Sequence, residues 1–296
     1  MKKQLVALAV TLTLASLAQA DTIAKVKASG SVTMGVRDSS GALSYTLGDG
    51  KYTGYHVEIC QAILADLEKA VGKKVDIKYQ SVTSQNRIPL VQNGTVDIEC
   101  GSTTNNATRQ KDVSFANTTF VEEVRIAVKA NSGITSIAQL NGKNVATTTG
   151  TTSVQTLRKN ERATGVDFKE VFGKDHSESF LLLESGRADA FVMDGSILAG
   201  NIATSKNPAD FRIVGEVLSV EPIAIMMRKD DPAFKKLADE TIAGMAKSGA
   251  LAKLYDKWFM QPIPPKNTKV GLAASDGIKA AWATPNDKSM EEYAKK

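Results

Sequence analysis

Three arginines lie in turns that are rich in hydroxyl side chains. The segments are Val36-Arg37-Asp38-Ser39-Ser40, Thr83-Ser84-Gln85-Asn86-Arg87 and Thr104-Asn105-Asn106-Ala107-Thr108-Arg109. A guanidinium can hold a carboxylate through two charge-assisted hydrogen bonds, and neighbouring hydroxyls and helix-start amides add neutral donors. One such arginine is common on any protein surface, but three near predicted strand ends indicate a site for an anionic ligand.

Two further segments could complete such a site. Residues 147–153 read as a strand end, a Gly turn and a helix start, where exposed amides attract anions, although a simple helix cap is equally consistent with them. Asp194 follows the apolar run Ala190–Met193. Its carboxylate could accept bonds from an ammonium group or cap the next helix.

Catalytic and metal-binding patterns do not occur in the chain. The two histidines, His56 and His176, lack metal-ligand spacing, and there is no CxxC, GxSxG, Walker or GxGxxG motif. Taken alone, both histidines are expected to be solvent-exposed. We therefore expect no metal, no cofactor and no enzymatic activity.

The elements that must position these residues alternate between short β-rich runs and longer helical ones, which is typical of an α/β fold. The expected strands are Ser31–Val36, Val75–Tyr79, Val96–Cys100, Asn144–Thr148 and Ala188–Met193. The expected helices are Val57–Ala70, Ser84–Asn93, Thr152–Ala163, Glu178–Ser185, Pro232–Lys247 and Leu251–Phe259. Residues from Ala274 onward are expected to form a peripheral helix or a frayed tail.

A faint internal repeat links two of these units. Leu90–Ile98 and Leu182–Ala190 share the frame L-x-x-x-G-x-x-D-x, which describes a helix ended by Gly, a turn and an apolar strand. If the copies occupy equivalent places in two lobes, Ser102 and Asp194 lie at corresponding carboxyl ends of strands. Open α/β sheets bind their ligands at such ends.

The amino terminus is typical of a secretory signal peptide. Lys2 and Lys3 precede an apolar stretch that ends in Ala18-Gln19-Ala20, which predicts cleavage after Ala20. Cleavage would remove 20 of 296 residues, leaving 276, and would lower the formal charge from +5 to +3 by removing two lysines. So weak a charge gives no reason to expect nucleic acid as a partner. No later apolar segment is long enough to span a bilayer, so we expect a soluble exported protein of two domains.

The only two cysteines are Cys60 and Cys100. In an oxidising compartment an even count favours a disulfide, which would close a long loop and stabilise the fold by roughly 3 to 4 kcal/mol. Two buried free thiols are the alternative, because spacing alone does not bring two Cβ atoms together.

Six segments together resemble the polar amino-acid-binding proteins of ATP-binding-cassette importers. They are Gly54–Ile59, Asn93–Asp97, Thr108-Arg109-Gln110 ahead of Phe115, Leu140–Lys143, Gly186–Asp189 and Lys257-Trp258-Phe259. The resemblance covers essentially the whole chain after residue 20. Ser81–Pro89 and Glu99–Asn105 are similar to the periplasmic glutamate/aspartate-binding branch of that family.

This resemblance implies a two-lobed periplasmic-binding fold of type II with the ligand cleft between the lobes. Two strands would cross between the lobes, near Phe120–Val124 and Leu218–Pro222. Residues 21–121 and 221–296 would form lobe 1, and residues 122–220 would form lobe 2.

The resemblance also implies a role for each residue of the site. Arg109 would hold the ligand's α-carboxylate with help from the hydroxyls or amides of Thr104 and Thr152. Ser102 and Asp194 would take the α-ammonium. The side-chain carboxylate would be held by Arg37, Ser84, Arg87 and His176. With Asp194 as the only acid, three arginines leave the site at +2, and a bound glutamate or aspartate leaves it at +1.

The implied function is capture of glutamate or aspartate by cleft closure and delivery to membrane permease subunits, by a periplasmic protein that acts as a monomer. A neutral ligand would leave the distal arginines unpaired. Two alternatives remain: binding of another polar amino acid such as glutamine, and a dehydratase-type enzyme on the same fold with Glu99 or Glu221 as general base.

Overall fold

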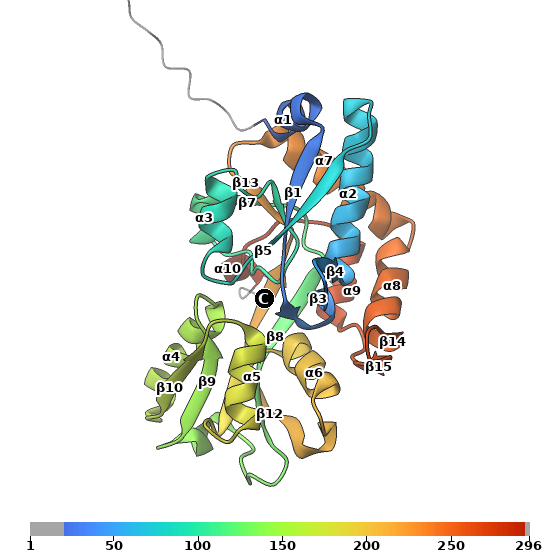
Figure 1. The fold of residues 1–296 in the computed structure, drawn as a ribbon. Coiled ribbons are helices and arrows are strands. Elements are labelled where there is room, and N and C mark those ends of the chain that lie inside the picture. The colour runs from blue at the N-terminus through green and yellow to red at the C-terminus, as the bar shows by residue number, and fades with distance from the viewer. Residues whose placement is uncertain (1–20, 294–296) are drawn as a thin grey trace, which may run out of the picture.

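The computed structural model describes residues 21–293 and consists of two lobes, each built around a five-stranded sheet (Figure 1). The predicted signal peptide, residues 1–20, lies outside the described residues. The first sheet has the order β5-β1-β6-β13-β7 and the second has the order β10-β9-β11-β8-β12. The predicted α/β, two-lobed architecture is therefore confirmed.

The strands of the first sheet are β1 (Ser31–Val36), β5 (Asp76–Ser81), β6 (Ile98–Glu99), β7 (Val113–Phe115) and β13 (Met226–Arg228). Those of the second sheet are β8 (Phe120–Lys129), β9 (Asn144–Thr148), β10 (Lys169–Gly173), β11 (Ala190–Asp194) and β12 (Phe211–Ile223). In the first sheet β1 pairs parallel with β5 and β6, and in the second β9 pairs parallel with β10 and β11. The carboxyl ends of parallel neighbours meet at one edge, so each sheet presents such an edge for binding.

The helices of the first lobe are α1 (Thr22–Ser29), α2 (Tyr55–Val71), α3 (Arg87–Gln92), α7 (Pro232–Lys247), α8 (Ala250–Tyr255), α9 (Asp276–Ala283) and α10 (Met290–Tyr293). Those of the second lobe are α4 (Thr152–Thr164), α5 (His176–Glu184) and α6 (Gly195–Thr204). Short strands complete the first lobe: β2 (Ser39–Ser40), β3 (Ser44–Gly48), β4 (Lys51–Thr53), β14 (Pro262–Ile263) and β15 (Thr268–Lys269). Among residues 21–293, no helix is both long and apolar enough to span a bilayer.

Helix α2 illustrates how the sequence builds the first lobe. Its apolar residues Ile59, Ile63 and Leu67 recur every four positions, and all three are fully buried. The helix ends at Gly72, whose φ of 73° is the left-handed conformation that glycine adopts without strain. Its buried face packs into the main core, which also contains Trp258 of the C-terminal region.

Strands β8 and β12 connect the two lobes. They pair antiparallel from Phe120↔Ile223 to Lys129↔Phe211, with an irregularity between Val214 and Ser219. Figure 1 shows both strands passing between the lobes. The predicted crossing segments lie at the start of β8 and the end of β12. The division at residues 121/122 and 220/221 stays a prediction.

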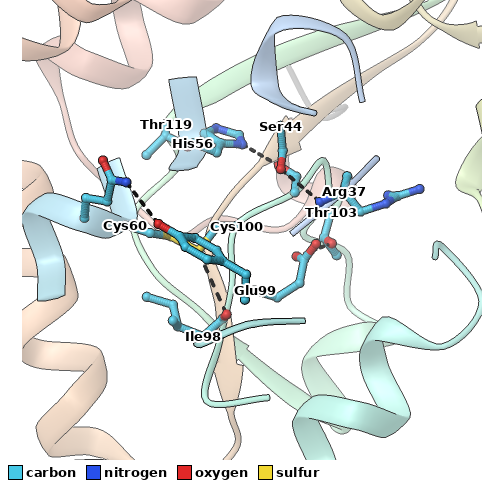
Figure 2. Close-up of a disulfide and its surroundings, with 12 residues drawn as sticks. Arg37, Ser44, His56, Cys60, Ile98, Glu99, Cys100, Thr103 and Thr119 are labelled. Atoms are coloured by element: carbon cyan, nitrogen blue, oxygen red, sulfur yellow. Dashed lines mark hydrogen bonds between the residues drawn. A yellow bond between two sulfur atoms is a disulfide. The ribbon is translucent and has the colours of Figure 1, made fainter. Parts of the chain in front are cut away.

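Cys60 of α2 and Cys100, which follows β6, are joined by a disulfide with an S–S distance of 2.11 Å and a Cα–Cα distance of 6.3 Å (Figure 2). The bond attaches the helix to the segment that leads to Ser102.

The expectation that His56 is solvent-exposed is wrong, because this side chain is fully buried. Its Nδ1 lies against the carbonyl of Gly101 and its Nε2 lies 2.9 Å from Thr119 Oγ1. Gly54, which immediately precedes α2, approaches the backbone of Leu43 so closely that a Cβ would lie 2.5 Å from its carbonyl oxygen. Burial therefore gives this polar ring a structural role in the first lobe.

Candidate functional site

All nine predicted ligand-binding residues are buried, with none more than 9% exposed. Arg37 follows β1, Ser84 and Arg87 follow β5, and Ser102, Thr104 and Arg109 follow β6. In the second lobe, Thr152 begins α4, His176 begins α5 and Asp194 ends β11. The loops at the carboxyl ends of the parallel strands thus supply the site, because both sheets turn those ends toward each other.

The Arg37 guanidinium makes contacts in both lobes. Its Nη1 donates to Ser102 Oγ at 3.4 Å, and its Nη2 donates to Ser84 Oγ at 3.1 Å and to His176 Nε2 at 3.2 Å. Because a guanidinium only donates, His176 Nε2 must accept, which leaves Nδ1–H to donate to Thr148 Oγ1 at 3.0 Å. Both ring nitrogens are therefore engaged by protein groups.

His176 is consequently neutral. Burial, with the nearby charges of Arg37 and Arg87, holds the pKa of His176 well below its usual range. A neutral ring that accepts from Arg37 fixes the direction of that guanidinium.

Arg87 is the opposite case. Its side chain is 2% exposed, yet Nε and Nη1 have no hydrogen-bond partner within residues 21–293. Burial lowers the pKa of Arg87, while the charges of Glu99, Asp194 and Glu221 act in the other direction. A buried cation whose N–H groups lack acceptors lowers the stability of the fold. An anion that accepted from Nε and Nη1 of Arg87 would remove this cost.

Arg109 is held by backbone oxygens from both lobes. Its Nη1 donates to Thr104 O at 2.9 Å and its Nη2 approaches Gly150 O at 3.5 Å. Burial and the charge of Arg87 lower the pKa of Arg109 to about 9, which still leaves it charged at neutral pH.

Asp194 resolves the alternative that the sequence left open. It occupies the N-cap position of α6, but its side chain makes no capping hydrogen bond. In the described chain its Oδ1 is buried without a partner, and burial together with Glu122 and Glu221 raises the pKa of Asp194 well above its usual range. The side chain therefore does not cap the helix, and its unpartnered Oδ1 is available to a ligand group.

Sequence reasoning considered Glu99 and Glu221 only as alternative general bases, and it counted neither of them, nor Glu122, in the charge of the site. Glu99, Glu122 and Glu221 are each no more than 2% exposed, and Glu99 and Glu221 act electrostatically on Arg87. The count of +2 applied only with Asp194 as the single acid of the site, and these glutamates do not meet that condition. The sequence positions of Glu122 and Glu221 could have indicated that they lie at the site, because both fall within the predicted crossing segments. In the structure they are paired in the register of β8 and β12.

Glu122 has its own partner in the second lobe. Its carboxylate accepts from the Ser196 backbone N–H at 3.2 Å and from the Ser196 hydroxyl. Burial raises the pKa of Glu122 to about 7, and the nearby charge of Glu221 acts in the same direction.

The lobes are closed on each other around these residues. Thr104 Oγ1 of the first lobe lies 3.2 Å from Thr152 Oγ1 of the second, and Ser177 N donates to Ser39 Oγ at 3.2 Å. A Cβ on Gly200 of α6 would lie 2.9 Å from the Gly41 Cα. The charged side chains and unpartnered polar atoms gathered where the lobes meet are suited to a small molecule that carries anionic groups and a cationic group.

The chain is similar to known solute-binding proteins over most of its length. The chain is 44% identical over 285 residues, 93% of its length and 94% of its relative's, to the glutamate/aspartate import solute-binding protein of Escherichia coli (strain K12). It is also 44% identical to the L-glutamate/L-aspartate-binding protein of Pseudomonas aeruginosa, covering 92% of this chain and 90% of that one.

Solved structures share the two-lobed fold. An ancestral arginine-binding protein bound to arginine matches with a TM-score of 0.68 and 30% identity, over 78% of this chain and 98% of that one. Residues 32–261 match the family model described as bacterial extracellular solute-binding proteins, family 3. These matches extend over most of the sequence and both lobes, and we conclude that the chain belongs to the family 3 bacterial extracellular solute-binding proteins.

Proposed function

We propose that this solute-binding protein, which is not an enzyme, captures glutamate or aspartate between its lobes. The observation that carries the proposal is the buried Arg87 guanidinium, whose Nε and Nη1 lack partners in the described chain. A neutral side chain on the ligand would leave this cation unpaired, whereas a second carboxylate would pair with it. The names of the relatives from Escherichia coli and Pseudomonas aeruginosa support the same ligand class.

The residues divide into three groups in this proposal. Arg109 and the amides near Thr104 and Thr152 hold the α-carboxylate. Ser102 and Asp194 take the α-ammonium. The remaining residues surround the side-chain carboxylate, with Arg37, Ser84 and Arg87 in contact and His176 positioning Arg37.

The mechanism is ligand-driven closure. Because the ligand contacts both lobes, it binds the closed state more tightly and shifts the open-closed equilibrium toward it. Residues 21–121 and 221–296 move as one lobe against residues 122–220. Cleavage after Ala20 releases the protein into the periplasm, where the closed monomer delivers its ligand to the permease subunits of an ATP-binding-cassette importer. Nucleic acid plays no part.

Titration calorimetry tests the proposal on protein that has been unfolded, dialysed and refolded to remove carried-over ligand. Glutamate or aspartate should bind with micromolar or tighter affinity, which corresponds to about −8 kcal/mol or more. Glutamine is the matched control, since it differs from glutamate only by an amide in place of the distal carboxylate. Comparable affinities for glutamate and glutamine would contradict the assignment of Arg87 and Arg37.

A further inference from the structure

Glu221 is a fully buried carboxylate that joins the two lobes and has no role in the ligand assignment above. It lies on β12, near the point where that strand returns to the first lobe. Its Oε2 accepts from Thr104 Oγ1 and from Thr152 Oγ1, each at 2.6 Å. Its Oε1 accepts from Ser219 Oγ at 2.8 Å. One carboxylate oxygen thus bridges a threonine of each lobe.

These contacts fix the hydrogen-bonding direction of both threonines. A carboxylate only accepts, and each hydroxyl has a single hydrogen to give. With both hydrogens directed at Glu221, the contact of 3.2 Å between Thr104 Oγ1 and Thr152 Oγ1 has no hydrogen left to share. Each hydroxyl oxygen therefore presents only lone pairs to a ligand.

A pair of acceptor hydroxyls suits a cation better than an anion. Asp194 lies close enough to Glu221 for their charges to interact, and in the described structure its buried Oδ1 has no partner. The two acids and the two hydroxyl oxygens, which can only accept, together suit a group that carries several N–H donors. An α-ammonium fits this description, while a carboxylate would meet lone pairs at both hydroxyls.

We propose that Glu221 is a specificity-determining residue, which holds the Thr104 and Thr152 hydroxyls as acceptors and so makes an α-ammonium a requirement for binding. This inference rests on the proposed function and deepens it. The hydroxyls contact the ammonium, and only backbone amides of these segments remain for the α-carboxylate. Thr152 begins α4, where the first amides have no acceptor within the helix.

The test compares glutamate with glutarate, which has the same two carboxylates and no amine. Glu221→Gln keeps the shape of the side chain but removes its charge, so the side chain holds the two threonine hydrogens less firmly and one of them can turn toward the ligand. Calorimetry for glutamate and displacement of glutamate by glutarate give the two affinities. We expect Glu221→Gln to lower the ratio of glutamate to glutarate affinity at least tenfold, with most of the loss in glutamate binding.

Glu99→Gln is the matched control. Glu99 is equally buried and accepts from Thr103 Oγ1 at 2.6 Å, but no hydrogen bond joins it to the Thr104–Thr152 pair. Because any effect of Glu99 on the arginines acts on carboxylates that both ligands share, its substitution should leave the ratio within about twofold. An equal loss for glutamate and glutarate in Glu221→Gln would overturn the inference and leave Glu221 as a clamp between the lobes.

A second pair of variants keeps the inference testable should Glu221→Gln fail to fold. Thr152→Val removes one acceptor hydroxyl and should lower the same affinity ratio, whereas Thr152→Ser retains the hydroxyl and should restore it. A ratio unchanged in Thr152→Val would also overturn the inference. If the unaltered protein binds neither glutamate nor aspartate, the proposed function fails and the inference with it; tight glutamate binding with unchanged ratios rejects the inference alone.

Discussion

The two lobes supply different groups to the proposed ligand contacts. The first lobe carries all three buried arginines, Arg37, Arg87 and Arg109, while the second carries Asp194 and the neutral His176. The repeat makes the contrast sharper, since corresponding strands β6 and β11 lead to a hydroxyl at Ser102 and to an acid at Asp194. Neither lobe alone can neutralise a zwitterion with a second carboxylate. Affinity must therefore depend on closure as well as on the individual contacts.

The arginines also differ in how far the protein satisfies them. Arg37 has three protein partners, from both lobes, whereas Arg87 has none at Nε and Nη1 in the described structure. A satisfied buried ion contributes to the fold, but an unsatisfied one costs stability and reserves its bonds for a ligand. Within one cluster, Arg87 is therefore the arginine with the most unused donors for a ligand, while Arg37 is already held in a fixed orientation by the protein.

The largest effect is expected from Arg87→Met. Loss of a buried charge-assisted pair should raise the dissociation constant for glutamate about a hundredfold or more, while the melting temperature of the ligand-free protein should not fall. Calorimetry and thermal unfolding measure the two quantities. Arg158→Met is the control, because Arg158 is exposed and pairs with Glu170 at 2.7 Å, so glutamate affinity should not change. A fall in melting temperature that matches the affinity loss would make Arg87 a structural residue.

Asp194→Asn tests the other lobe. It should weaken glutamate binding about thirtyfold, since one charge-assisted interaction contributes about 2 kcal/mol. Glutarate affinity should hardly change, because the lost partner is an ammonium that glutarate lacks. Arg87→Met should weaken both ligands. If Asp194→Asn weakens glutarate as much as glutamate, the two lobes do not read different groups of the ligand.

Glu122→Gln tests the acids of the connecting strands through pH. Because the folded protein raises the pKa of Glu122 from about 4.5 to about 7, the folded state binds more protons than the unfolded state between these values. Glu122 therefore stabilises the fold fully at low pH, and this contribution is lost as pH rises to 7. Denaturant unfolding at pH 5 and pH 7 measures the change.

The free energy of unfolding at pH 7 minus that at pH 5 should be about 2 kcal/mol larger for Glu122→Gln than for the unaltered protein. His56 acts in the opposite direction, because burial lowers its pKa to about 4 and its contribution to stability is lost as pH falls below 6.5. Because Glu122→Gln removes the opposing contribution of Glu122, the stability of this variant should rise more steeply with pH than that of the unaltered protein. An unchanged pH dependence would show that Glu122 is ionised in the fold.

The smallest effect is expected from Gly200→Ala, which changes the contact between lobes and no proposed ligand contact. The new Cβ would lie 2.9 Å from Gly41 Cα, so it hinders closure. Glutamate affinity should fall about tenfold, although alanine within a helix is intrinsically favoured over glycine by up to about 1 kcal/mol.

The matched control is Gly244→Ala in α7, where a Cβ would meet no atom within 4 Å. It offers the same gain in helix propensity and should leave affinity unchanged. Equal affinities of the two variants for glutamate would mean that the contact between Gly41 and Gly200 does not limit closure.

Much of the fold could be read from local pattern. The predicted bounds of β1, β9 and α7 agree with the structure, because apolar periodicity and flanking Gly or Pro residues mark them. The hairpin strands β2 to β4, over residues 39–53, were not predicted. Their short runs are polar and half-exposed, so they carry little periodic signal. The C-terminal segment was also underspecified, and its order depends on contacts such as Asn105 Nδ2 to Asp287 O at 2.9 Å.

The sequence by itself determined that arginines and hydroxyls gather after strand ends in an α/β chain, since residue order fixes which side chains follow which strand. Only the tertiary structure decided which arginine is satisfied, which tautomer His176 adopts, that His56 is buried and which way the Thr104 hydroxyl points. Those properties depend on partners remote in the chain: Arg37 meets His176 across 139 positions, and Thr104 meets Glu221 across 117. Hydrogen-bond direction and desolvation arise only in the folded chain, because both are set by the complete set of neighbours.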